Sequence, residues 1–210
     1  PEGKLSSRLF RAGVNFYFRP AVRAQLTREI RAQFELFRGY GLALDHVNCH
    51  KHLHLHPTVF ALITEIGAAY GLKAVRLPYE PLSGAAPDLL RKGGAGQLAA
   101  SLFLLPWTGL LKRKIRAAGL RANDFIFGMR DSGRMESARV LRLLPRLPAG
   151  VTEMYFHPAA RSCPELTAEA PGARHEAEFA ALTDPAFPAA LAELGIRRVS
   201  FSDLPLNIHA

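Results

Sequence analysis

The order of helix-like and strand-like segments along the chain predicts an α/β fold. A helical period over residues 19–40 is followed by a short apolar run at 42–47, and a second helical period over 57–71 is followed by another apolar run at 74–77. Helices that alternate with short strands are typical of parallel sheets. With 210 residues, of which 49% are hydrophobic and 21% charged, the chain is long enough to bury a substantial core.

Each of these first four elements has its own local signals. Gly39 and Gly41 end the first helix, and Pro57 begins the second, since proline suits the first helical position. Gly71 closes the second helix, and Pro78 ends the strand after it. Apolar side chains recur every three or four residues in both helices: Val22, Leu26, Ile30, Phe34 and Phe37 in the first, and Val59, Phe60, Ile63, Ile66 and Tyr70 in the second.

The rest of the chain continues the alternation. Residues 82–119 are rich in Gly, Pro and Ala, and we interpret them as a lid or insertion within a single domain spanning 1–210. After this segment the pattern predicts strands at 124–128 and 151–156, a last strand and loop at 199–203, and helices at 136–144, 176–182 and 189–194.

The basic charge of the chain has several possible explanations and does not by itself identify a partner. Lysine and arginine number 27 against 18 acidic residues, which gives a formal net charge of +9. An arginine-rich genome would explain this excess, and so would attraction to an anionic membrane, substrate or nucleic acid. The sequence has no RNP aromatic motif, zinc-finger spacing or basic heptad region, so we predict no nucleic-acid partner.

An apolar segment at 98–114 ends in a cluster of cations, Lys112-Arg113-Lys114. Its uninterrupted apolar runs are shorter than the roughly 18 residues of a membrane span. Two interpretations stay open: an interfacial segment in peripheral contact with a membrane, and a buried helix or lid.

The two cysteines, Cys49 and Cys163, indicate neither a disulfide framework nor a structural zinc site. We therefore predict a reducing, cytoplasmic location. The chain starts at Pro1 with no initiator methionine or signal peptide, and we expect the natural polypeptide to begin earlier.

The densest chemical signal is a histidine run within residues 48–57, preceded by Asp45 and His46. Imidazole is the commonest protein metal ligand and titrates near neutral pH. In an extended run all four histidines would share one face, and in a helix they would divide between two faces. We expect a strand end that enters a helix at Pro57, with one or two imidazoles pointing into a cleft. The four alternating histidines are His50, His52, His54 and His56.

Candidate site residues also lie at the ends of other predicted strands. His50 and His157 each follow a strand, Arg76 lies within one, and Asp203 follows the last. Because active sites of α/β folds gather at the carboxyl ends of strands, we expect these residues to converge.

Structural alternatives accompany three of these candidates. His157 is as compatible with packing as with catalysis, Arg76 could form an ion pair with Glu80, and Asp203 could be a cap or loop residue. A further histidine, His175, is followed by Glu176 and Glu178, and we expect it to belong to a surface helix.

Two blocks of the sequence resemble the YdjC-like carbohydrate deacetylases, a group that includes the chitooligosaccharide deacetylases. Residues 44–57, Leu-Asp-His-Val-Asn-Cys-His-Lys-His-Leu-His-Leu-His-Pro, look like the signature of this family, and 153–158 look like its second block, a strand ending in His-Pro. The segments 76–81 and 200–204 look closest to the hopanoid-biosynthesis-associated branch, called HpnK. The resemblance covers nearly the whole chain.

The resemblance implies a deformed TIM-like α/β barrel that hydrolyses the acetamido group of an N-acetylated sugar or glycolipid. It implies that His50 binds a divalent metal and that His157 is a catalytic residue near the active site. It also implies that His52 and His54 are supporting neighbours. In our interpretation Arg76 and Asp203 support the site as well. The Asp-Asp-Phe-Gly block and a later histidine block that open the family pattern do not occur here. The chain would then lack the N-terminal strands of the barrel, a catalytic aspartate and one metal ligand, and could be inactive alone.

The expected mechanism combines a metal-activated water with proton transfer. The metal would lower the pKa of the water and stabilise the oxyanion, a carboxylate from the absent block would be the base, and His157 would protonate the leaving amine. The family implies magnesium, whereas imidazole ligands favour zinc or another transition metal.

Two other functions are also compatible with the sequence. One is a non-catalytic, membrane-associated protein of hopanoid metabolism that binds a lipid or a partner, and another is a metal-dependent phosphoesterase. A homodimer is a further partner prediction.

Overall fold

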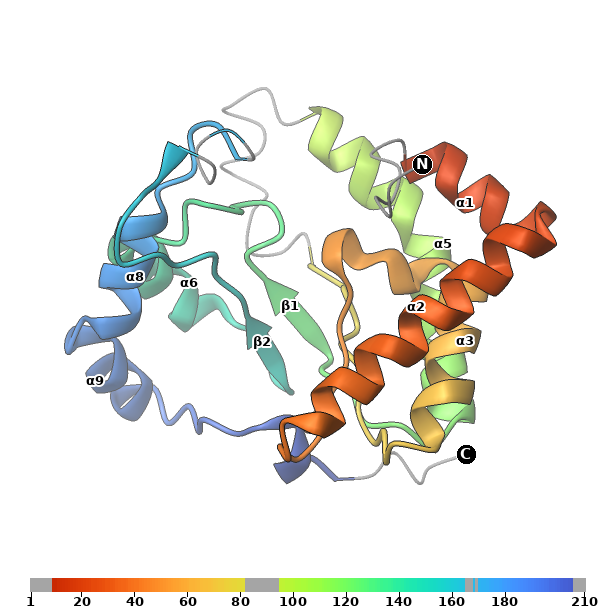
Figure 1. Cartoon of the computed structure of the whole chain (residues 1–210). Coiled ribbons are helices and arrows are strands. Elements are labelled where there is room, and N and C mark those ends of the chain that lie inside the picture. Colours follow the sequence, from red (N-terminus) through yellow and green to blue (C-terminus); the bar gives the residue numbers. More distant parts are fainter. Residues whose placement is uncertain (1–8, 82–94, 165–167, 169, 206–210) are drawn as a thin grey trace. The chain divides into compact units, whose positions relative to one another are not determined.

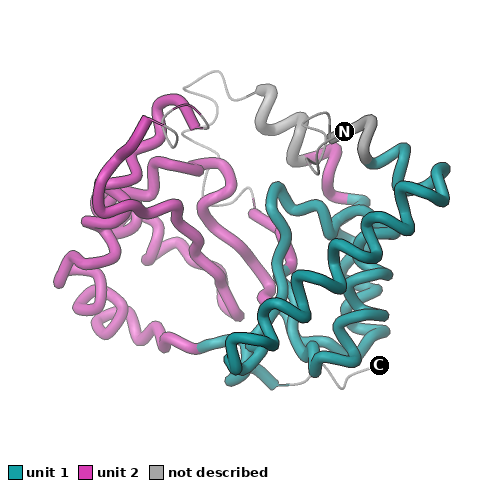
Figure 2. Tube along the Cα trace, viewed as in Figure 1, with its two compact units in different colours: residues 1–76, 106–122, 200–210 teal, residues 77–105, 123–199 magenta. Residues whose placement is uncertain are grey.

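The computed structural model describes residues 9–81, 95–164, 168 and 170–205 (Figure 1). The chain divides into two compact units (Figure 2). Unit 1 comprises residues 1–76, 106–122 and 200–210, and unit 2 comprises 77–105 and 123–199. The structure is a helix-rich α/β fold with a small parallel sheet, which confirms the predicted fold class. The closed barrel and the single domain spanning 1–210 stay predictions.

Unit 1 begins with three helices that pack on one another: α1 (Leu9–Phe18), α2 (Pro20–Gly39) and α3 (Pro57–Ala68). The predictions of α2 and α3 are confirmed, and proline opens both. Phe34 of α2 stacks on Tyr70 with ring centroids 5.2 Å apart, and an added Cβ at Gly67 would lie only 2.9 Å from Phe34. Glycine at this position therefore lets the two helices approach closely. The buried apolar residues of these two helices include Leu26, Ile30, Phe34, Val59, Phe60, Leu62, Ile63 and Ile66.

Three extended segments of unit 1 lie side by side in parallel. Val47 pairs with Val75, and Ala74 pairs with Arg121. Helix α3 connects the first pair and α5 (Ala95–Ala117) connects the second, as expected for β-α-β crossovers. The predicted strands at 42–47 and 74–77 are thus reduced to single bridges.

Unit 2 contains one regular parallel pair, β1 (Phe125–Phe127) and β2 (Thr152–Met154), with Ile126 opposite Glu153. The helix α6 (Ser137–Leu143) and the short 3-10 turn η3 (Leu144–Arg146) lie between them in sequence. Helices α8 (His175–Thr183) and α9 (Ala186–Glu193) follow. The two strands and the three α-helices agree with the predictions, although both strands are shorter than expected, and the turn η3 is an addition.

The core of unit 2 lies against β1. Phe127, Met135, Val140, Leu143 and Ala181 form a buried cluster with partly buried aromatic neighbours.

Buried polar groups hold the segment at 77–80 against β1 and its flanking residues. Asn123 exchanges two hydrogen bonds with the backbone of Leu77, at 2.7 and 2.8 Å, and the N–H of Ile126 donates to the carbonyl of Tyr79. Glu80 accepts a hydrogen bond from the backbone N–H of Arg130 and lies 3.6 Å from its guanidinium. Burial raises the pKa of Glu80, and Arg130 opposes this effect.

One prediction from the sequence is wrong, and another falls partly outside the described residues. The predicted strand at 199–203 is wrong, because Phe201–Asp203 forms a 3-10 turn, η4, closed by a reciprocal capping box between Ser200 and Asp203. The predicted lid at 82–119 contains the described helix α5, while residues 82–94 lie outside the described residues.

Candidate functional site

The histidine run forms a kinked 3-10 segment, η1 (His50–Leu55), rather than the expected strand end. Lys51 and His52 adopt left-handed backbone conformations, with φ of 51° and 54°. Such conformations are unfavourable for residues other than glycine and occur often at functional sites. The kink breaks the alternation that would place the four imidazoles on one face.

The individual rings consequently have different surroundings. His54 is fully buried, and its Nε2–H donates to the carbonyl of Arg76 at 2.8 Å. Burial lowers the pKa of His54 to about 4, so this ring is neutral at physiological pH. The ring of His52 lies 6.2 Å from that of His54 in an edge-on arrangement. The supporting roles of both residues stay predictions.

His56 has a structural role at the start of α3. Its Nδ1 accepts the backbone N–H of Thr58, which makes it the N-cap of the helix. Its ring packs edge-on against Phe16 and Tyr17, with centroids 5.6 and 4.6 Å away. Burial lowers the pKa of His56 as well.

His50 is exposed and lines a pocket of about 420 Å³ within unit 1. The pocket lies between α2 and the histidine run. Its polar lining consists of Glu29 and Gln33 of α2 together with His46, Asn48, Cys49 and His50. Its apolar wall consists of Leu26, Ile30, Phe34, Phe37, Leu44, Val47, Leu53, Val59 and Ile63. This volume falls within the range of small-molecule sites.

Cys49 lines the same pocket but is a poor nucleophile. Burial raises the pKa of its thiol to about 11. Since the thiolate is the reactive form, Cys49 is almost entirely unreactive thiol at neutral pH.

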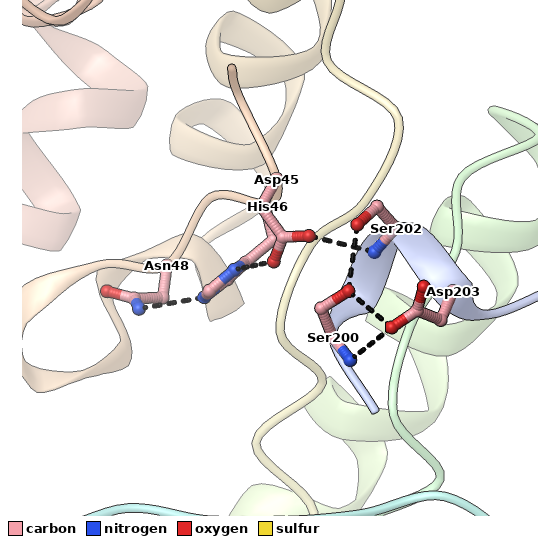
Figure 3. A network of polar contacts seen from close by, with 6 residues as sticks. All are labelled: Asp45, His46, Asn48, Ser200, Ser202 and Asp203. Atoms are coloured by element: carbon pink, nitrogen blue, oxygen red, sulfur yellow. Dashed lines mark hydrogen bonds and ion pairs between the residues drawn. The ribbon is translucent and has the colours of Figure 1, made fainter. Parts of the chain in front are cut away.

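A polar network crosses from the start of the histidine run to the η4 turn (Figure 3). His46 Nδ1 lies 3.0 Å from Asp45 Oδ2, and Asp45 Oδ1 accepts the backbone N–H of Ser202 at 2.8 Å. Although partial burial acts in the opposite direction, the hydrogen bonds of His46 and Ser202 hold the pKa of Asp45 below its usual value. The ring of His46 also stacks on Phe201, with centroids 4.2 Å apart and an interplanar angle of 24°.

Asp203 belongs to this network through Ser200. Its Oδ2 accepts hydrogen bonds from the backbone N–H and the hydroxyl of Ser200, at 2.8 and 2.7 Å, and the hydroxyls of Ser200 and Ser202 lie 2.8 Å apart. Asp203 therefore orders the η4 turn that contacts Asp45. The capping role that we considered as an alternative is present.

Arg76 is tied to the histidine run through its backbone. Its carbonyl accepts the hydrogen bond of His54, and its N–H donates to the carbonyl of Val47 at 3.1 Å. Arg76 thus connects two of the segments that carry candidate residues in unit 1.

His157 belongs to unit 2, where it follows β2 on an exposed segment. Its backbone N–H donates to Glu178, and its carbonyl accepts a hydrogen bond from Nδ1 of His175 at 2.6 Å. The N–H of Ala159 donates to the carbonyl of His175, and that of Ser162 donates to Glu176. The first turn of α8 therefore fixes the backbone that presents the imidazole of His157.

The surface position predicted for His175 is wrong. Glu178 is fully buried and also accepts the backbone N–H of Met135 at 2.9 Å, while His175 is 6% exposed. Charged residues are rarely buried unless paired, and nothing local in the sequence shows that distant backbone groups would satisfy this carboxylate. The Asp45–His46 pair, in contrast, had a visible signal, since both residues directly precede the histidine run.

The donor set around His50 does not by itself complete a metal site. Across residues 9–81, 95–164, 168 and 170–205, no three His, Cys, Asp or Glu side chains come close enough together to hold an ion. His46 and His50 line the pocket, whereas His54 is hydrogen-bonded to Arg76 and His56 to Thr58.

Comparison with known proteins gives a consistent result across the chain. A family model described as YdjC-like protein matches residues 1–193. A carbohydrate deacetylase of Geobacillus stearothermophilus is 27% identical over 184 residues, which cover 87% of this chain and 61% of the relative. Carbohydrate deacetylases of Mus musculus and Homo sapiens are 32% and 31% identical, covering 86% and 89% of this chain and 62% and 64% of the relatives.

The chain therefore spans about three fifths of the length of these curated relatives. No solved structure matches it significantly.

Proposed function

The chain belongs to the YdjC-like protein family, and we propose from this that it takes part in the hydrolytic removal of an acetyl group from an N-acetylated sugar or glycolipid. The observation that carries the proposal is the pocket of unit 1, which brings His46 and His50 together beside an apolar wall. The similarity to carbohydrate deacetylases supports this reaction for the site.

We assign the roles within this reaction as follows. His50 is the proposed ligand of a divalent cation, with magnesium implied by the family and zinc or another transition metal favoured by an imidazole donor. Such a cation, when bound, lowers the pKa of water. His157 is the proposed residue that protonates the leaving nitrogen. His52, His54, Arg76 and Asp203 support the site through the contacts described above.

The wider setting is part of the same proposal. We propose a cytoplasmic protein whose strands belong to a deformed TIM-like barrel and whose substrate is linked to hopanoid biosynthesis, as in the HpnK branch. The apolar wall of the pocket favours a substrate that carries an apolar group beside its acetamide.

Acetate release by the full-length protein from N-acetylated amino sugars tests this function. We expect activity that a chelator abolishes and that added zinc or magnesium restores, and we expect its loss in His50→Ala. Lys51→Ala, which changes the neighbouring exposed residue, is the matched control. An unchanged rate in His50→Ala would show that the role of His50 is wrong.

A second candidate function is peripheral binding to an anionic membrane, with or without catalysis. Phe103, Trp107 and Leu110 are 72%, 41% and 36% exposed and recur at helical spacing along one face of α5. Lys112 and Arg113 follow directly, and cations beside exposed apolar side chains suit a surface of anionic lipid. None of the described helices has the length and apolar content needed to cross a bilayer.

Co-sedimentation with phosphatidylglycerol vesicles and with phosphatidylcholine vesicles tests this candidate. We expect binding to the anionic vesicles alone, and weaker binding for Trp107→Ser and for Lys112→Glu. Equal sedimentation of the substituted and unsubstituted proteins would contradict a role for this face of α5.

A further inference from the structure

Asp45 and His46 form a carboxylate–imidazole pair whose protonation pattern follows from its contacts. An ionised carboxylate only accepts hydrogen bonds, so the ring nitrogen that faces Asp45 at 3.0 Å, Nδ1, must carry the proton. The pKa of Asp45 lies below its usual value, so this carboxylate is ionised at neutral pH. With the proton on Nδ1, Nε2 is the ring nitrogen that can accept a hydrogen bond, and it lies 3.4 Å from the amide nitrogen of Asn48.

The ring of His46 is also fixed in orientation. Phe201 stacks on one of its faces. Asp45 is itself held by the N–H of Ser202 (Figure 3). The side chain of His46 nevertheless remains 26% exposed, and it lines the same pocket as His50 and Asn48. Thus an oriented imidazole whose Nε2 can accept a proton belongs to the wall of the candidate substrate pocket.

We propose that His46 is a catalytic residue that accepts the proton of the attacking water, with Asp45 as its positioning residue. As the oxygen of water bonds to the acetamide carbon, one water proton moves to Nε2, and Asp45 stabilises the imidazolium that forms. The C–N bond then breaks as the departing nitrogen takes up a proton from the acid of the reaction. Acetic acid and the free amine leave, and His46 returns its proton to solvent.

This inference rests on the proposed function, and it goes beyond it by supplying a base from residues of this chain. A purely structural role for the pair is the competing explanation, since Asp45 also connects the histidine run to the η4 turn. The two explanations differ in what they require of Nε2. Both include its contact with Asn48, but only the catalytic role requires this atom to take up a proton.

The decisive variant is His46→Asn in the full-length protein. The asparagine amide can replace Nδ1–H as a donor to Asp45 but has no counterpart of Nε2. We expect kcat for acetate release to fall about a hundredfold to ten-thousandfold with little change in KM, which is typical for loss of a general base. Asp45→Asn should lower kcat by a smaller factor. His56→Asn, which keeps an N-capping side chain on a neighbouring histidine, is the matched control and should retain activity.

Two further readouts separate catalysis from structure. Imidazole added to His46→Gly should restore activity with saturation, which a structural role would not produce. Nitrogen NMR of histidine-labelled protein should show His46 protonated at Nδ1. Full activity of His46→Asn, or the opposite tautomer, would overturn the inference and leave the proposed function standing. Absence of acetate release from the unsubstituted protein on every N-acetylated sugar tested would overturn both.

Discussion

Glu178 accepts the backbone N–H of His157, although the two residues are 21 positions apart and the carboxylate is fully buried. The same side chain accepts the N–H of Met135, so a single carboxylate connects the end of β2, the loop before α6 and the first turn of α8. A buried charge is tolerated only with such partners.

The substitution Glu178→Gln should therefore destabilise unit 2. The amide would face a backbone N–H with its own NH₂ group, and we expect the free energy of unfolding to decrease by about 2–3 kcal/mol. Glu176→Gln is the matched control, because Glu176 lies on the same turn but accepts the N–H of Ser162 at the surface, and it should cost less than about 1 kcal/mol. Urea denaturation followed by circular dichroism compares the two, and equal effects would contradict the importance of the buried contacts.

The buried contacts of Glu178 also show which parts of the structure the sequence could predict. Helices α2 and α3 were predictable because their apolar spacing and initial prolines are local signals that agree with each other. The burial of Glu178 was not predictable, because its partners lie 21 and 43 residues away. Average propensity places such a residue at the surface.

In the candidate site, too, the features with a local sequence signal were predictable and those that depend on distant residues were not. The location of His50 and the neighbouring Asp45–His46 pair could be deduced from the histidine run itself. The left-handed conformations of Lys51 and His52 run against the preference of both residue types, so the sequence predicts a strand end that enters a helix at Pro57 and not this kink. The contact between Asp45 and Ser202 joins positions 157 residues apart, and only the folded chain reveals it.

His54 should make stability depend on pH on the acidic side of neutrality. Burial lowers its pKa from 6.5 to about 4, so the unfolded chain binds a proton in this interval and the folded chain does not. The contribution of His54 to stability is therefore fully present above about pH 6.5 and is lost as the pH falls towards 4, by at most about 3 kcal/mol.

His54→Gln tests this dependence, because glutamine keeps a donor for the carbonyl of Arg76 but does not titrate. We expect the variant to lose less stability than the unsubstituted protein between pH 6.5 and 4, as measured by urea denaturation at several pH values. A remaining slope is expected from His56, whose pKa burial also lowers. Identical slopes in the two proteins would contradict the neutral, buried state of His54.

Cys49 should resist alkylation in the folded protein. Its pKa of about 11, compared with 9.0 for an unperturbed thiol, reduces the thiolate fraction at pH 8 by about a hundredfold. We expect iodoacetamide to modify Cys49 at least about a hundredfold more slowly in folded than in urea-unfolded protein. A Cys163→Ser background isolates this thiol, and mass spectrometry measures its rate of modification. Equal rates before and after unfolding would be incompatible with the burial of Cys49.

The left-handed backbone at Lys51 should make glycine the better residue at this position. A left-handed conformation costs a residue with a Cβ about 1–2 kcal/mol, whereas glycine adopts it freely but loses more entropy on folding. We therefore expect Lys51→Gly to raise the free energy of unfolding by about 0.5–1 kcal/mol. Lys51→Gln, which removes the charge and keeps the strain, is the reference, and Lys51→Val should destabilise because its branched side chain tolerates this backbone poorly. If glycine and glutamine gave the same unfolding midpoint in urea, the strain assigned to the kink in η1 would be absent from the protein in solution.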